Sequence, residues 1–313
     1  VAQVAALYKG NPFHNFEHAS HVLMSANKLL KRIIHPDDLD YTLDGSEDKT
    51  SKLQSLMKEL HMSTYGISSD PLTQFAIVFS ALIHDADHSG LPNAQLGVEK
   101  AEVAVRFNNK SVAEQNSFFL AWELLMEPHY DVLRACIWSS AAEKQRFRQL
   151  VVNSVMATDI VDKAQQTIRK KRWDKAFMEP QDTLRSTVTG DLDMNRKATA
   201  VLEHIIQASD VAHTMQHWRI YCKWNERFFR ESYFAWMNGR ADSDPSIGWF
   251  EGEIEFYDFY IIPLARKLKE SGVFGVSSDE YLQYALENRQ EWELKGRQVC
   301  EVMLQDARYE WEA

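Results

Sequence analysis

The sequence predicts an all-α fold, a single compact domain built from many helices. Its 313 residues are 45% hydrophobic but include only 12 Gly and 8 Pro, a composition that favours helices and a large buried core. Apolar residues recur at helical spacing along most of the chain, and few segments alternate as half-buried strands do. Since no linker rich in Pro, Gly or Ser divides the chain, we expect residues 1–313 to form one unit.

The predicted helices follow from this spacing, taken in chain order. In SHVLMSANKLLKRII, residues 20–34, an apolar stripe predicts an amphipathic helix. The acidic, apolar-poor residues 36–51 are typical of a solvated loop. After Pro71, LTQFAIVFSALI is apolar almost all round, which indicates a helix buried on every side. Further helices are expected at residues 98–106, 114–125, 130–136, 144–158, 196–211, 217–236, 253–271 and 278–303.

Charge and cysteine content restrict the class of protein. A net charge of −10 argues against general binding to nucleic acid. The three cysteines, Cys136, Cys222 and Cys300, are odd in number and lack CxxC spacing, which favours a reducing compartment and a cytoplasmic location. No apolar run is long enough to span or insert into a membrane. Because the chain starts at Val1 rather than Met, we expect a fragment of a longer protein.

Ionisable residues stand at the ends of the apolar helices. His84 and Asp85 follow the helix after Pro71, His14 and His18 are four residues apart, and Asp210 ends another apolar segment. Each alone is typical of an ordinary packed or solvent-facing side chain. Burying such groups costs several kcal/mol unless a charge compensates for it. Two imidazoles and two carboxylates together would suit Zn²⁺ or a similar ion, with Asp85 able to bridge to a harder ion such as Mg²⁺.

Two motifs carry a family resemblance. HNFEHASHV at residues 14–22 matches HNxxHAxxV, and HDADHSGLPN at residues 84–93 matches HDxDHxGxxN. FNNKSVAE, MATD, ASD and GEIEFYDFYIIPL follow farther along the chain. In this order the sequence resembles the catalytic domain of class I cyclic nucleotide phosphodiesterases over nearly its whole length. It looks most like protozoan members, such as the kinetoplastid type C enzyme, and the resemblance implies the all-α fold of His-Asp metallophosphohydrolases.

The resemblance implies a site with two divalent metals. It implies four ligands of a tightly held Zn²⁺: His18, His84, Asp85 and Asp210. Asp85 would bridge to Mg²⁺ or Mn²⁺. Four further residues fall where family members hydrogen-bond the waters of that second metal: His88, Glu102, Thr158 and Asp159.

The resemblance also implies the reaction. A hydroxide bridging the two metals would attack phosphorus in line and yield a nucleoside 5′-monophosphate. His14 matches the general acid that protonates the O3′ leaving group, and Glu231 matches the carboxylate that orients it.

The expected base pocket contains a departure from the family. Phe256 and Phe228 match the aromatic residue and the apolar wall that hold the purine, but Glu253 stands where family members have glutamine. An ionised carboxylate only accepts hydrogen bonds, whereas an amide also donates. Glu253 therefore has a raised pKa, turns away or favours guanine. His213 resembles members that accept both nucleotides, so we expect cAMP hydrolysis, with cGMP as a second candidate substrate.

Two alternatives stay open at the level of sequence. One is a His-Asp superfamily hydrolase of another phosphate ester, such as a nucleoside triphosphate or an alarmone. The other is a domain that binds a cyclic nucleotide as a sensor without hydrolysing it, a hypothesis motivated by Glu253. The sequence leaves the oligomeric state undetermined.

Overall fold

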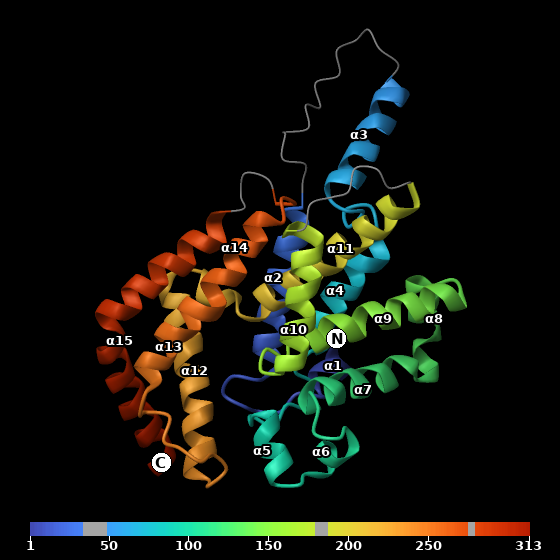
Figure 1. The fold of residues 1–313 in the computed structure, drawn as a ribbon. Coiled ribbons are helices and arrows are strands. Elements are labelled where there is room, and N and C mark those ends of the chain that lie inside the picture. Colours follow the sequence, from blue (N-terminus) through green and yellow to red (C-terminus); the bar gives the residue numbers. More distant parts are fainter. Residues whose placement is uncertain (34–48, 179–186, 275–278) are drawn as a thin grey trace.

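The computed structural model describes residues 1–33, 49–178, 187–274 and 279–313, and within these ranges all regular structure is helical (Figure 1). The prediction of an all-α fold is thus confirmed. None of the described helices is both long and apolar enough to cross a bilayer.

Three helices form the centre of the domain: α2 (Phe16–Lys31), α4 (Pro71–Ile83) and α11 (Thr187–Asp210). The side chain of Asn15 caps α2 by accepting from the backbone N–H of His18 at 3.0 Å, and Asp70 caps α4. Apolar side chains of all three helices are fully buried in one core cluster. Capping and packing thus fix the three helices relative to one another, and with them the residues at the helix ends.

Two groups of helices cover the centre on opposite sides (Figure 1). On one side, α7 (Val112–Met126) and α9 (Ala141–Ala157) pack with α4 around a second apolar cluster. On the other side lie α12 (Trp218–Met237), α13 (Trp249–Phe256), α14 (Ile262–Glu270) and the long α15 (Glu280–Glu312). The remaining α-helices are α1 (Ala2–Ala5), α3 (Lys49–Ser63), α5 (Asn93–Val98), α6 (Glu102–Arg106), α8 (Asp131–Ile137) and α10 (Lys163–Trp173).

Short helical segments of other types complete the description. The 3₁₀-helices are η1 (Pro128–Tyr130) and η3 (Ala212–Met215). The π-helices are η2 (Asp174–Met178) and η4 (Tyr257–Ile261). Because η4 joins α13 to α14, the helix expected at residues 253–271 is continuous only through a π-helical turn, and it begins earlier, at Trp249.

Two further predicted elements differ from the structure. The helix expected at 98–106 is interrupted after Val98, where Lys100 has a positive φ of 51°, and α6 then starts at Glu102. Of the loop expected at 36–51, residues 36–48 lie outside the described ranges and 49–51 belong to α3. Helix α10 is not among the predicted helices, because its composition is strongly polar.

Gly296 allows α15 to pack closely on α13, and this generates a stability prediction. A Cβ atom at Gly296 would lie 2.8 Å from side-chain carbons of Trp292 and 2.9 Å from Phe250. We expect Gly296→Ala to lower the free energy of unfolding by about 1–3 kcal/mol, measured by denaturant titration. Gly252→Ala is the matched control, since a Cβ there meets nothing within 4 Å; it should change stability by less than about 1 kcal/mol, in the stabilising direction. Equal losses in the two variants would contradict the packing argument.

Candidate active site

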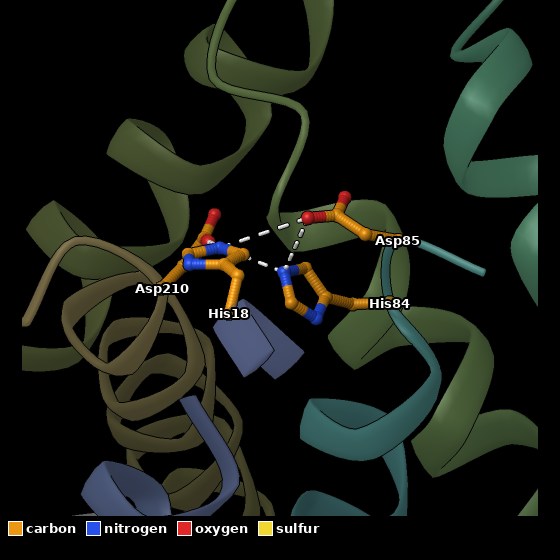
Figure 2. Close-up of side chains that lie close together, drawn as sticks. All are labelled: His18, His84, Asp85 and Asp210. Carbon is orange, nitrogen blue, oxygen red and sulfur yellow. Dashed lines mark hydrogen bonds and ion pairs between the residues drawn. The ribbon is translucent and has the colours of Figure 1, made fainter. Parts of the chain in front are cut away.

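Four ionisable side chains meet where the three central helices begin or end (Figure 2). His18 lies in the first turn of α2, His84 and Asp85 directly follow α4, and Asp210 is the last residue of α11. One potential ligand atom from each residue lies within 4.8 Å of those of the others. The structure therefore brings together the four residues that the sequence predicts as metal ligands.

The distances show how tightly these atoms converge. Nε2 of His84 lies 3.0 Å from Oδ2 of Asp85 and 3.2 Å from Oδ1 of Asp210. Nε2 of His18 lies 3.1 Å from the same oxygen of Asp210 and 3.6 Å from Oδ2 of Asp85. Both histidines are buried, with at most 1% of their surface exposed. Two imidazole nitrogens and two carboxylate oxygens thus share one enclosed volume.

The protonation pattern of His84 favours a cation in that volume. Its Nδ1 donates to the carbonyl oxygen of Ala81 at 3.0 Å, so in the neutral ring Nε2 carries a lone pair that faces two carboxylates. Burial disfavours the charged imidazole, but Asp85 and Asp210 raise the pKa of His84 well above its usual value. Burial likewise opposes ionisation of the two carboxyls, yet His84 draws both pKa values below the usual range. This donor set fits a divalent metal ion, which would replace the proton.

A second group lies beside the first and consists of His14, His88 and Glu231. Glu231 projects from α12 and is 5% exposed. Its Oε1 accepts a hydrogen bond from Nδ1 of His14, and its Oε2 accepts from the backbone N–H groups of Phe13 and His14 at 2.9 and 3.0 Å. Three donors therefore fix the carboxylate, and the carboxylate fixes the imidazole.

His14 and His88 have opposite protonation preferences although their ring centroids are only 3.8 Å apart. Burial opposes a charge on His14, but the ionised Glu231 raises its pKa to about 9. Burial and the positive charge on His14 lower the pKa of His88 to about 4. The backbone N–H of Gly90 donates to Nδ1 of His88 at 3.1 Å. At neutral pH the pair thus holds one cationic and one neutral imidazole.

Two of the residues expected around the second metal occupy short polar turns near the site. Asp159 is buried, and its carboxylate accepts from the hydroxyl of Ser111 at 2.6 Å and from two backbone N–H groups of the following turn. Thr158 ends α9, and its hydroxyl donates to the carbonyl of Val155 at 2.8 Å.

The structure does not bring Glu102 to the site. Glu102 is exposed in the first turn of α6, which follows the interruption at Lys100. Glu114, on α7, lies there instead: burial and the negative charge of Asp159 raise its pKa to about 7, and Asn93 donates to it at 2.9 Å. The signal for Glu114 is present in the sequence, since this residue ends the motif FNNKSVAE.

Aromatic side chains line the other side of the site. Phe13 is buried, with ring centroids 4.5 Å from His18 and 5.7 Å from His213. Phe228 on α12 keeps 39% of its surface exposed, and its ring lies 5.1 Å from that of Phe13 and 6.1 Å from that of His14. Phe228 therefore presents an apolar face next to His14.

Glu253 and Phe256 share one face of α13. Glu253 is buried and accepts a hydrogen bond from the hydroxyl of Tyr221 at 2.6 Å. Phe256 is half-buried and stacks on Tyr260, with 5.3 Å between centroids. Sequence reasoning missed Tyr221 and its neighbour Asn225, which also hydrogen-bonds Glu253.

The geometry of the His/Asp cluster predicts where metal binding is lost. We expect His84→Ala and Asp210→Asn to reduce the affinity for divalent metal by more than about tenfold, because the first removes a ligand nitrogen and the second removes the negative charge of a ligand carboxylate. Metal content after dialysis, measured by elemental analysis, tests this. His129→Ala is the control, since that histidine is exposed. Full metal content in the two cluster variants would contradict the assignment.

Comparison with known proteins agrees with this geometry. Residues 13–272 match the family model described as 3′5′-cyclic nucleotide phosphodiesterase. A probable 3′,5′-cyclic-AMP phosphodiesterase of Caenorhabditis elegans is 26% identical over 239 residues, which cover 76% of this chain and 29% of the relative. A dual specificity calcium/calmodulin-dependent 3′,5′-cyclic nucleotide phosphodiesterase 1C of Homo sapiens is 26% identical over 225 residues, 71% of this chain and 25% of the relative. The chain thus spans less than a third of either relative.

A solved structure shares the fold. The phosphodiesterase domain of a rhodopsin–phosphodiesterase fusion protein from the choanoflagellate Salpingoeca rosetta superposes with a TM-score of 0.67 at 22% identity, covering 97% of this chain and 83% of that chain. The family model covers more than half of the chain, from residue 13 to residue 272. The chain belongs to the 3′,5′-cyclic nucleotide phosphodiesterase family.

Proposed function

We propose that residues 1–313 form a catalytic domain that hydrolyses 3′,5′-cyclic nucleotides to nucleoside 5′-monophosphates. The observation that carries this proposal is the position of a cationic imidazole beside a metal-ligand cluster: the rings of His14 and His18 are 6.3 Å apart. A cyclic phosphodiester needs both an electrophilic activation of phosphorus and a proton for the departing oxygen. The two adjacent groups supply one requirement each.

The residues that would hold a metal in this proposal are His18, His84, Asp85 and Asp210. Their donor set would suit Zn²⁺, and the carboxylate of Asp85 would also be available to Mg²⁺ or Mn²⁺. When bound, the metals supply Lewis-acid activation of the phosphoryl group and of water. His88, Thr158 and Asp159 are proposed to orient water near the second metal, and Glu114 takes the place that the sequence assigned to Glu102.

His14 acts as the general acid in this proposal. Its Nδ1 is occupied by Glu231, so the proton available to a substrate is on Nε2. That proton passes to O3′ as the bond between O3′ and phosphorus breaks. Glu231 stabilises the cationic ring before transfer and keeps the ring in one orientation.

Phe228, Phe256, His213 and Glu253 are proposed to form the base pocket. Phe228 and Phe256 offer aromatic faces, and buried His213 lies on the metal side of the pocket. We propose cAMP as a substrate and cGMP as a second one, consistent with relatives named for cyclic AMP and for dual specificity. We also propose a cytoplasmic location, which the free thiols of the three cysteines support.

The test is release of 5′-AMP from cAMP and of 5′-GMP from cGMP by the purified chain with Mg²⁺ or Mn²⁺ supplied. We expect turnover, and a fall of about 10²–10⁴-fold in kcat for His14→Ala with metal content retained. Binding of nucleotide without product, in metal-loaded protein, would favour the sensor. Turnover of a nucleoside triphosphate alone would favour another phosphate ester as substrate.

The pair of His14 and Glu231 predicts a pH effect. Activity that needs protonated His14 is lost as pH rises through the pKa of that ring, which is about 9 and becomes lower when a metal neutralises Asp85 and Asp210. Glu231→Gln removes the negative charge that raises this pKa. We therefore expect the alkaline limb of the kcat/KM profile to move to lower pH. At acidic pH, where His14 is protonated in both proteins, kcat/KM should change less.

Glu226→Gln is the matched control for this experiment, since Glu226 is also on α12 but is not in the His14 group. Its profile should follow that of the unmodified chain. An alkaline limb that stays in place in Glu231→Gln, at whatever activity remains, would show that Glu231 does not set the pKa of the acid.

A further inference from the structure

We propose that Glu253 recognises the purine in its neutral form, donating one hydrogen bond to N1 of adenine and accepting another from the 6-amino group, and that its ionised form favours guanine. The inference rests on the proposed function and deepens it, because it states how the base is selected.

Glu253 is fixed in a buried position. Its exposed fraction is 9%, and the hydroxyl of Tyr221 donates to its Oε2 at 2.6 Å. Tyr221 is itself fully buried, and its ring packs 5.6 Å from that of Trp292. Because Tyr221 keeps its proton, Oε2 of Glu253 must accept there. A proton on the carboxyl group therefore lies on Oε1.

A second hydrogen-bonded pair fixes the same carboxyl group. The indole N–H of Trp249 donates to Oδ1 of Asn225 at 3.1 Å, which sets the orientation of the Asn225 amide. The amide nitrogen of Asn225 is then the atom that can donate to Glu253. A neutral Glu253 held in this way offers an O–H donor and a carbonyl acceptor side by side, as a glutamine amide does.

Helix α12 connects the carboxyl group of Glu253 with His14, the proposed general acid. Tyr221, Asn225, Phe228 and Glu231 recur at intervals of three or four residues, so they share one face of the helix. Tyr221 and Glu231 are separated by ten residues, or about 15 Å along the axis. The Glu231 end holds His14 and the Tyr221 end holds Glu253. A nucleotide with its phosphate at the His/Asp cluster thus lies along α12 with its base toward Glu253.

The surroundings of Glu253 keep its charge variable near neutral pH. Burial raises its pKa to about 7, while the hydrogen bonds from Tyr221 and Asn225 act in the opposite direction. The titratable groups that face it are Tyr221 on α12, Tyr257 in η4 and Cys300 on α15. Burial raises the pKa of each, to about 11 for Cys300, so all three are neutral when Glu253 titrates.

Ionisation would reverse which purine fits. Adenine presents an acceptor at N1, which a carboxylate repels, whereas guanine presents donors at N1 and at its 2-amino group, which a carboxylate accepts. The preference for cAMP over cGMP should therefore decline as pH rises through the pKa of Glu253. His14 also titrates, but it acts on both substrates alike, so the ratio of their kcat/KM values isolates the base pocket.

The experiment measures that ratio between about pH 6 and pH 9 in the metal-loaded chain. We expect the ratio of cAMP to cGMP efficiency to fall by up to about tenfold per pH unit above about pH 7. Glu253→Gln should make the ratio independent of pH. Glu255→Gln is the matched control: it removes the same charge from an exposed position on α13 and should keep the slope.

A second variant tests the hydrogen bond from Tyr221. Tyr221→Phe removes a donor that stabilises the ionised carboxylate, so the midpoint of the change in ratio should move to higher pH. Infrared spectroscopy provides a readout independent of activity: below pH 7 the band of protonated carboxyl groups should be weaker in Glu253→Gln than in the unmodified chain, and the part that remains in Glu253→Gln belongs to Glu114.

The outcomes separate this inference from the function on which it rests. A ratio that is flat with pH in an enzyme that hydrolyses both nucleotides would overturn the role of Glu253 and leave the proposed function intact. A carboxyl band of equal strength in the unmodified chain and in Glu253→Gln would overturn it as well. If metal-loaded protein hydrolyses neither nucleotide, the proposed function is overturned, and the proposed role of Glu253 in recognising the purine is overturned with it.

Discussion

The negative charge enclosed by the central helices is the constraint on which the rest of the structure depends. Asp210 ends α11, and Asp85 follows the end of α4. Both carboxylates therefore lie at the ends of helices where backbone carbonyl groups already concentrate partial negative charge. Burial makes this arrangement unfavourable without a cation. The approach of α2, with His18 in its first turn, completes a set of donors that a divalent metal would satisfy.

The protonation states of the residues around the His/Asp cluster differ from one position to the next. His14 is made cationic by Glu231, whereas His88, in contact with the same ring, is kept neutral by burial and by His14. Glu114 and Glu253 lie in different parts of the site, and burial raises the pKa of both to about 7. The site thus places a cationic and a neutral histidine ring 3.8 Å apart, because burial and neighbouring charges act differently on the two rings.

The sequence could predict the fold class and the centre of the site, because both depend on local pattern. Helical spacing of apolar residues identifies most helices, and two short motifs contain His14 and three of the four residues of the His/Asp cluster. The outer residues depend on contacts between distant segments. Glu102 and Glu114 lie within the same stretch, and the structure shows that Glu102 is exposed on α6 whereas Glu114 on α7 lies near Asp159. Likewise, Tyr221 and Glu253 are 32 residues apart, and no spacing rule joins them.

Helix α12 has a consequence for how this chain can vary. The number of residues between Tyr221 and Glu231 determines how the two side chains are rotated relative to each other about the helix axis, so that both contact the proposed nucleotide site. Adding or deleting one residue there would rotate one end by about 100° relative to the other and turn Glu231 or Tyr221 out of its partner's reach. Loops on the surface tolerate insertions, but this stretch of helix does not. Side chains on the exposed face of α12 can therefore change more readily than the number of residues between Tyr221 and Glu231.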